Sequence, residues 1–243
     1  MITMSTMIKK LLFELLCIYC VVGIPFAISY YGWYGLIIQT IIGYVSTIID
    51  WCLFPNTEKN FLLLEKAGFS RKTVWMIMLL NLVLTNLLVG LVYNFSSVSE
   101  LNISIIPKIC LNLGVTEIFF TSAHAMLHYT KCGARIHLMH HCCKHSSWST
   151  NLMFHPFDMA SEFSGPVISV LALHIFWKVD MVLISSVLII HLWYALDHSD
   201  FLKLPHTKHH SHINSMFSIY INKYITLRRP DHVRKMIRVI EQK

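Results

Sequence analysis

Long apolar runs, separated by short polar stretches, occupy the first half of the chain. The runs from Leu11 to Ser29, from about Gly32 to Phe54 and from Val74 to Tyr93 each have about the 20 mostly apolar residues that a helix needs to cross a bilayer. A fourth run begins at Ile105 and continues to about Phe120, where the first histidines follow. The pattern predicts an integral membrane protein with about four transmembrane helices.

The second half of the chain has a different pattern. Residues 165–198 are apolar, but Lys178 and Asp180 interrupt them, so we expect two helical arms of a membrane hairpin and not one further span. Lys and Arg favour the cytoplasmic side of a membrane. Because the segment 55–74 is net basic and the segment 95–108 is poorer in basic residues, we expect the N-terminus and the histidine-rich region on the cytoplasmic face.

Composition supports a membrane environment. Of the 243 residues, 55% are hydrophobic and only 14% are charged, against about 25% charged in an average soluble domain. So little charge cannot cover a soluble globule, and so apolar a chain is not disordered. The net charge of +7 comes mostly from residues 199–243, which hold nine Lys or Arg and three acidic residues. Such a tail favours an anionic membrane surface or an acidic protein, and we expect no nucleic acid partner because no basic and aromatic recognition motif accompanies it.

Histidine is the most informative residue type. All 15 histidines lie between His124 and His232. Residues three or four apart share a helix face, and three clusters have this spacing: His124 and His128; His137, His140 and His141; His206, His209 and His210. Eight imidazoles exceed the three or four ligands of one zinc ion, and no HExxH motif is present. The clusters therefore predict a site for two metal ions.

Two further histidines, His191 and His198, are seven residues apart, and Asp197 is a candidate acceptor for an imidazole N–H. Imidazole binds iron, zinc, copper and nickel alike, so the ligands do not choose the metal. A bimetal site at the membrane face, beside spans that admit a lipid tail, suits oxygen activation on an unreactive C–H bond. That chemistry needs a redox metal and favours iron. Cys142 and Cys143 lack the paired spacing of a cysteine site, and we expect them to be bystanders.

The order of these motifs resembles that of the fatty acid hydroxylase superfamily of membrane di-iron enzymes, which includes sterol desaturases, sterol methyl oxidases and cholesterol 25-hydroxylases. His155 in FHPFD and the Asp197-His198-Ser199 segment also fit, and Glu117 precedes His124 by seven residues, where the family often has Asp. The resemblance covers about residues 109 to 225. The chain departs from the family at Ala125, where an Arg is usual, and at Asp200, where a Gly is usual.

The resemblance implies a membrane anchor over residues 1–108 and a catalytic domain over residues 109–243, with the membrane hairpin 165–198 and the basic tail. The fold class is all-α, with about four transmembrane helices and a cytoplasmic histidine-rich helical cap that holds the bimetal site. The implied metal ligands are His124, His128, His137, His140, His141, His198, His206, His209 and His210. Further ligands, or groups that orient the ligating imidazoles through hydrogen bonds, would come from His191, His155, Glu117, Asp158 and Asp197.

The implied activity is that of an O2-dependent oxidoreductase with two iron ions, for which zinc can substitute in preparations. It would hydroxylate or desaturate a lipid, with a sterol as first choice and a fatty acyl chain or ceramide as second. Electrons would come from NAD(P)H through a reductase and a haem cytochrome, and in a eukaryote the family implies the endoplasmic reticulum membrane. The alternative is a non-catalytic histidine-rich metal transporter or sensor. A transporter would carry polar or charged residues along its spans as an ion path, whereas the first three spans hold no charged residue apart from Glu14 and Asp50.

Overall fold

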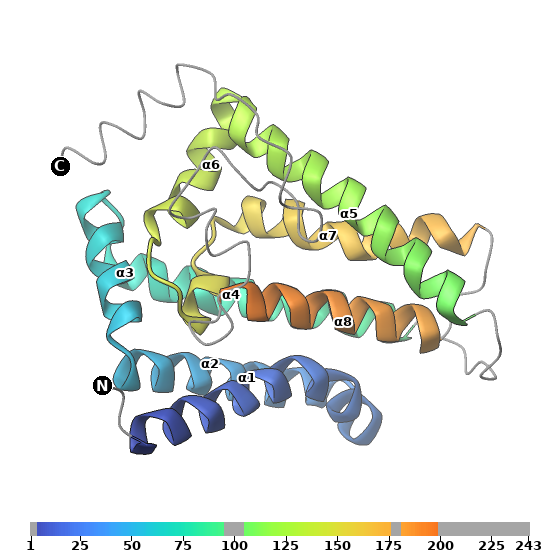
Figure 1. Cartoon of the computed structure of the whole chain (residues 1–243), viewed down its shortest axis with the longest axis horizontal. Coiled ribbons are helices and arrows are strands. Elements are labelled where there is room, and N and C mark those ends of the chain that lie inside the picture. Colours follow the sequence, from blue (N-terminus) through green and yellow to red (C-terminus); the bar gives the residue numbers. More distant parts are fainter. Residues whose placement is uncertain (1–3, 95–104, 176–180, 199–243) are drawn as a thin grey trace.

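The computed structural model describes residues 4–94, 105–175 and 181–198, and within these ranges the chain forms helices and no strand. The helices are shown in Figure 1. They are α1 (Met4–Tyr31), α2 (Tyr34–Leu53), α3 (Pro55–Lys66), α4 (Arg71–Asn94), α5 (Ile105–Tyr129), α6 (Lys131–Cys142), the short 3-10 helix η1 (Trp148–Leu152), α7 (Pro156–His174) and α8 (Met181–Asp197). The all-helical class predicted from the sequence is confirmed.

Four helices are long and apolar enough to cross a membrane. Their apolar parts are Met7–Tyr31, Tyr34–Leu53, Arg71–Tyr93 and Ile106–Tyr129. Each overlaps one of the four apolar runs of the sequence, so the predicted number of membrane-length apolar helices is confirmed for the described residues. The fourth span differs in one respect, because α5 continues beyond Phe120 to Tyr129 and carries the first two histidines on the same helix.

The helix α2 shows how such a bundle is held together. Its buried face is small or polar, with Gly35, Gln39, Gly43 and Ser46 among the buried residues, while its exposed face carries isoleucines such as Ile37. A Cβ atom added at Gly35 would lie 2.2 Å from the carbonyl oxygen of Ala27 in α1, so only glycine permits this approach. Small residues between helices and apolar residues outside are typical of packing within lipid.

One helix was not expected. The segment 55–74 reads as a mixed, basic connection, but residues Pro55–Lys66 form α3, with proline at the first helical turn, where its missing N–H costs nothing. Phe61 and Leu64 are fully buried and join a core that also contains Met78 of α4 and Met153 after η1. The helix α3 therefore fixes the connection between α2 and α4 against the η1 region.

The two helical arms predicted for the apolar hairpin are α7 and α8. They pack with α5 around a core that includes Phe120, Phe163 and Ile190. The interrupting residues Lys178 and Asp180 lie outside the described residues. The helix α5 passes through residue 108, the predicted boundary between anchor and catalytic domain, without a break.

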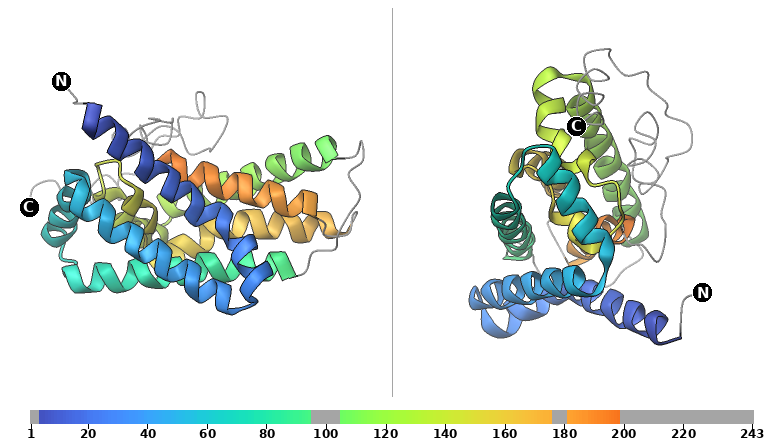
Figure 2. Two further views of the ribbon diagram at one scale, coloured as in Figure 1. Left: turned by 90° about the horizontal axis from the view of Figure 1, so that it is seen from below. Right: turned by 90° about the vertical axis from the view of Figure 1, so that its left-hand side faces the viewer.

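The parts of the helices that carry the first histidine clusters meet at one end of the bundle. Figures 1 and 2 show the start of α1, helices α3 and α6, η1, the start of α7 and the end of α8 at this end, and the turn between α1 and α2 at the other. Hydrogen bonds across this end include those from the Asn60 side chain to the carbonyl oxygen of His145 (2.7 Å) and from the Asn56 side chain to that of Ser146 (2.9 Å). Helix α3, which belongs to the net basic segment 55–74, and the first histidine clusters thus share one end of the bundle.

Candidate metal centre

Four histidines from two consecutive helices converge in the interior. His124 and His128 come from α5, and His137 and His141 come from α6. One ring nitrogen of each lies within 4.8 Å of one ring nitrogen of every other, and all four side chains are buried. Thr130 is the single residue between α5 and α6. Its hydroxyl accepts a hydrogen bond from the backbone N–H of Gly133 and caps the start of α6.

The distances within this four-histidine group suit a cation. Nε2 of His128 lies 3.0 Å from Nε2 of His124 and 3.2 Å from Nε2 of His141. An imidazole nitrogen has one in-plane bonding position, so His128 Nε2 cannot form a good hydrogen bond with both neighbours. Neighbouring nitrogen ligands of one ion, with metal–nitrogen bonds of about 2.0–2.1 Å, lie about 2.8–3.4 Å apart, depending on whether the geometry is octahedral or tetrahedral. Both distances from Nε2 of His128 fall in this range.

Two carboxylates of α7 lie next to the group, beside the Nδ1 atoms of two of its rings. Asp158 Oδ2 is 2.8 Å from Nδ1 of His137, and Glu162 Oε1 is 3.0 Å from Nδ1 of His124. The first contact is a hydrogen bond, whereas the second is at ion-pair distance but is not aligned as a hydrogen bond. A carboxylate beside Nδ1 keeps the proton there and leaves the Nε2 lone pair for a metal. Among the described residues, Nε2 of His137 has no hydrogen-bond partner.

Glu162 belongs to this site, and the histidine spacing in the sequence does not predict it. Burial, and then the neighbouring Asp158, raise the pKa of its carboxyl group well above the usual range. A bound cation would oppose this shift, because a nearby positive charge favours the carboxylate. The available signal was the spacing Asp158 to Glu162, four residues on one helix, which places both carboxylates on one face.

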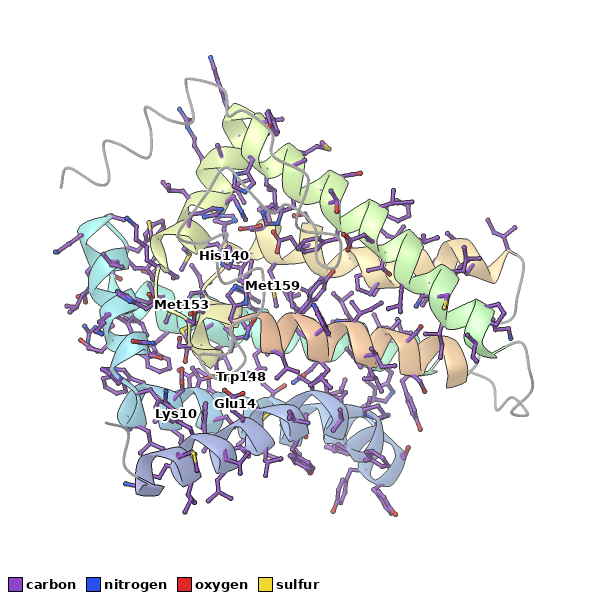
Figure 3. All side chains as sticks on the ribbon, viewed as in Figure 1. Lys10, Glu14, His140, Trp148, Met153 and Met159 are labelled. Atoms are coloured by element: carbon purple, nitrogen blue, oxygen red, sulfur yellow. The ribbon has the colours of Figure 1, made fainter. Side chains whose placement is uncertain are left out.

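His140 and His198 form a second pair beside the four-histidine group. Their ring centroids are 5.2 Å apart, and the ring of His140 stacks on Phe154 at 3.7 Å. The side-chain oxygen of Asn151 accepts a hydrogen bond from Nδ1 of His198 at 2.7 Å. Burial lowers the pKa of His198 to about 4, so its ring is neutral at neutral pH, the state that a metal ligand requires. Figure 3 shows His140 at the end of the bundle where α6, η1 and α7 meet.

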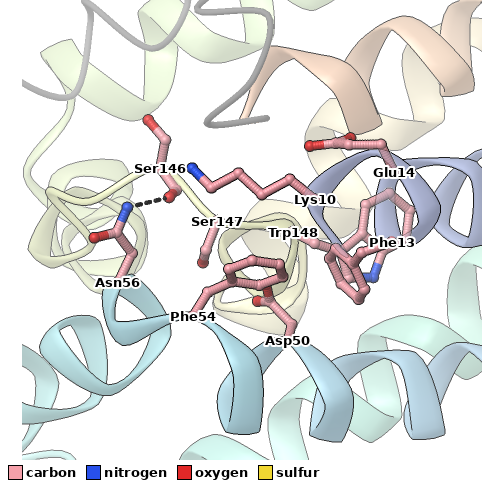
Figure 4. A pocket seen from close by; sticks show the side chains of 9 residues that line it. All are labelled: Lys10, Phe13, Glu14, Asp50, Phe54, Asn56, Ser146, Ser147 and Trp148. Atoms are coloured by element: carbon pink, nitrogen blue, oxygen red, sulfur yellow. Dashed lines mark hydrogen bonds between the residues drawn. The ribbon is translucent and has the colours of Figure 1, made fainter. Parts of the chain in front are cut away.

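Asp50 holds the η1 region in place. Its carboxylate accepts hydrogen bonds from Thr57 (2.6 Å), from the Ser149 hydroxyl (2.5 Å) and from the Ser149 backbone N–H (3.0 Å). Asp50 also lines a pocket of about 340 Å³ between α1 and η1. Figure 4 shows this pocket, with the Lys10 chain extending toward Ser146. Asp50 thus fixes the segment that carries Asn151 and leads to Phe154.

The structure does not bring every predicted residue into the metal centre. His155 is half-buried at the start of α7, where Nδ1 accepts the backbone N–H of Phe157 at 3.3 Å and caps the helix. Nδ1 of His191 is bonded to the carbonyl oxygen of Val187 at 2.8 Å. Neither belongs to the four-histidine group. Glu117 is buried on α5, two turns before His124.

Part of the predicted site lies outside the described residues. This holds for the last histidine cluster, His206, His209 and His210, and for the basic tail. Asp197 ends α8, but its side chain is not among those described. These residues therefore remain predictions.

The adjacent cysteines are buried next to the centre. Burial raises the pKa of Cys142 to about 11 and that of Cys143 well above its usual value. Both are therefore thiols at neutral pH, whereas a metal ligand is a thiolate. Cys143 Sγ lies 3.5 Å from Sδ of Met153 in the core, and neither cysteine belongs to the four-histidine group.

Comparisons of this chain with protein-family models, with curated proteins and with solved structures find no match. The described residues form helices, four of them long and apolar enough to span a membrane, and a buried four-histidine group that could hold a metal ion.

Proposed function

We propose that the protein is a membrane-bound non-haem di-iron oxygenase that hydroxylates or desaturates a lipid. The observation that carries the proposal is the four-histidine group, with carboxylates behind two of its rings, at the end of a bundle of membrane-length helices. Metal-binding histidines typically donate their second ring N–H to a carboxylate or a carbonyl group. A packed apolar core has no need of this arrangement.

The residues divide between two ions. His124, His128, His137 and His141 would hold the first. His140 and His198 would contribute to the second, together with the cluster His206, His209 and His210 that the sequence places after α8. Two irons, when bound, would supply the reduction of O2 that makes an unactivated C–H bond reactive.

The remaining roles belong to the chain itself. Asp158 and Glu162 would keep the Nδ1 protons of His137 and His124 in place, and Asn151 would do so for His198. The burial of the four histidines would exclude water from the centre. Holding the reacting carbon close is worth several kcal/mol, up to about ten, and the spans beside the centre would position a lipid.

A sterol is the first choice of substrate and a fatty acyl chain or ceramide the second. We place the histidine end on the cytoplasmic face, in a eukaryote at the endoplasmic reticulum. There an NAD(P)H-dependent reductase and a haem cytochrome would supply electrons, and the basic tail would dock the acidic donor or lie on the membrane surface. A non-catalytic metal transporter or sensor is the competing function.

The first test is metal analysis of protein purified without oxygen and reconstituted with Fe(II). We expect two irons per chain in the wild type and fewer in His128→Ala. Fewer than two irons in the wild type, with tightly retained zinc, would contradict the oxygenase and favour the competing function.

The second test is lipid analysis of cells that express the wild type, His128→Ala, His140→Ala or the control His145→Gln. We expect an oxygenated or unsaturated lipid in the wild type and in the control that both alanine variants lack. A lipid profile that does not change between the wild type and the alanine variants would exclude the proposed activity.

A further inference from the structure

Helix α3 lies at the histidine end of the bundle, between two membrane-length helices. Figure 1 shows α3 turned away from the direction of α2, and Phe54 alone separates the two helices. Residues 67–70 connect α3 to α4. Both α2 and α4 are long and apolar enough to cross a membrane. Connections this short hold α3 next to the ends of both helices, so it lies at the membrane surface when they cross the bilayer.

Aromatic side chains mark the same level. The ring of Trp75 in α4 lies 5.8 Å from that of Trp51 and 5.2 Å from that of Phe61, between centroids. The indole N–H of Trp51 donates a hydrogen bond to Glu58 at 2.6 Å. Tryptophan, with an apolar body and a polar N–H, is enriched where a membrane meets water. Met76, one residue further along α4, is exposed, as a side chain in contact with lipid would be. The junction of α2, α3 and α4 therefore has the side chains of a membrane interface.

Arg71 binds both acidic side chains of this region. Glu58 and Glu65 are the two acids of residues 55–74. The Arg71 guanidinium lies 2.8 Å from a carboxylate oxygen of Glu58 and 3.1 Å from one of Glu65. It also lies over the ring of Phe61, 5.3 Å from the centroid. The acids of the segment are thus taken up by its one arginine, and its lysines are left to other partners.

Three exposed lysines surround this junction. Lys59 and Lys66 lie three residues before and four residues after Leu62, so the three side chains share one exposed face of α3. Leu62 is 48% exposed between the two charges. Lys72 is exposed in the first turn of α4. Within the described ranges, none of these lysines is in an ion pair. Basic residues around an apolar side chain are typical of a helix that lies on an anionic membrane surface.

We propose that Lys59, Lys66 and Lys72 form a binding surface for the headgroups of anionic phospholipids. Lysine stems can lie along apolar surface while their ammonium groups reach the headgroups, and basic residues beside a membrane attract anionic lipids. Lipid is favoured over an acidic protein, because α3 is held at the ends of two membrane-length helices and beside interfacial tryptophans. The inference goes beyond the proposed function, because lipid binding here requires neither metal nor oxygen.

The test uses full-length protein in phosphatidylcholine vesicles that contain a small share of a brominated lipid, either phosphatidylserine or phosphatidylcholine. Bromine quenches nearby tryptophan fluorescence, and Trp51 and Trp75 lie at this junction. We expect phosphatidylserine to be enriched about fivefold beside α3, which corresponds to one lysine at an anionic surface, and high salt to weaken the preference. The variant with all three lysines replaced by glutamine should lose it, whereas the matched variant with three arginines should keep it. The other tryptophans contribute equally to all three proteins, so they cancel in the comparison.

Equal quenching of the wild type by the two brominated lipids would overturn the inference and favour an acidic protein at this surface, and this comparison needs no variant. A preference that persists in the glutamine variant would overturn it as well. Glu65→Gln removes an acid and keeps every lysine, so it should strengthen the preference. A protein that binds no iron but prefers phosphatidylserine would contradict the oxygenase and leave this inference standing.

Discussion

The four-histidine group and His191 are two kinds of buried histidine in one chain. All five side chains are at most 6% exposed and lie on helices. In the group, Nδ1 of two rings faces a carboxylate and three Nε2 atoms converge. In His191, Nδ1 bonds to the carbonyl group of its own helix. Neither burial nor a hydrogen-bonded Nδ1 therefore identifies a metal ligand, and the convergence of ring nitrogens from several histidines is the distinguishing feature.

His128→Ala gives the largest expected effect on this comparison. Its Nε2 is the nitrogen in contact with both His124 and His141, so its loss opens the middle of the group. Outer partners of a metal site already change affinity by about 10–100-fold, and we expect the loss of a direct ligand to exceed that range. Metal content after gel filtration, measured by mass spectrometry, checks it. His191→Phe is the matched control and should retain the wild-type metal content. An equal loss of metal from both variants would show that His191 and the four-histidine group do not differ in metal binding.

Asp158→Asn comes next in expected size. The change keeps the shape of the side chain but removes the charge that holds Nδ1–H of His137 at 2.8 Å. We expect metal affinity to fall by about 10–100-fold, measured by competition with a coloured chelator. Glu162→Gln should lose less, because the contact of Glu162 with His124 is not aligned as a hydrogen bond. An unchanged affinity in Asp158→Asn would show that the carboxylate does not support the site.

The fold was predictable from the sequence to the extent that hydropathy determines it. The four spans were found because a spanning helix requires about 20 apolar residues, a signal that survives without knowledge of packing. The sequence does not predict α3, because its apolar run, residues 61–64, is only four residues long and is flanked by charged and polar residues. Only its contact with α4 and η1 explains why that short helix is stable.

The site was predictable in its histidines and not in its partners. The three- and four-residue spacings place His124, His128, His137 and His141 on the faces that meet. The seven residues between His191 and His198 would be two turns of one helix, but α8 ends at Asp197 and His198 lies in the turn beyond it. A spacing rule holds only while the helix continues.

Two other features depend on tertiary structure. His155 precedes Pro156, a pair that also marks a helix start, and the structure uses the ring as the cap of α7. Asn151 gives no signal in the sequence, because its role depends on the end of α8 reaching η1. The periodicity of a sequence therefore does not predict hydrogen bonds between side chains and other elements of the fold.

Asn151→Ala tests the hydrogen bonds that link η1 to the end of α8 and to His198. The change leaves Nδ1–H of His198 and the carbonyl oxygen of Ala195 without their partner, which should lower the free energy of unfolding by about 1–3 kcal/mol. Thermal unfolding of the metal-free protein in detergent measures this. Thr85→Val is the control, because the Thr85 hydroxyl bonds only within its own helix, and we expect a change of less than about 0.5 kcal/mol. Equal destabilisation by both variants would show that the hydrogen bonds of Asn151 to Ala195 and His198 do not stabilise the contact between η1 and α8.

The smallest expected effect is on the pH dependence of stability and concerns His145, a third kind of histidine. Its backbone groups, and not its ring, are hydrogen-bonded to Asn60. Its N–H donates to Asn60 Oδ1 at 3.0 Å and its carbonyl oxygen accepts from Asn60 Nδ2 at 2.7 Å. Burial, and then Lys59 and Lys144, lower the pKa of its ring. The unfolded chain therefore takes up a proton at higher pH than the folded one, and the stability that neutral His145 contributes is lost as pH falls below about 6.5. His145→Gln cannot titrate, so its unfolding temperature should fall less than that of the wild type between neutral and mildly acidic pH, while its metal content stays unchanged. A parallel fall in both proteins would show that the ring does not titrate differently on folding, and a loss of metal would place His145 with the ligands.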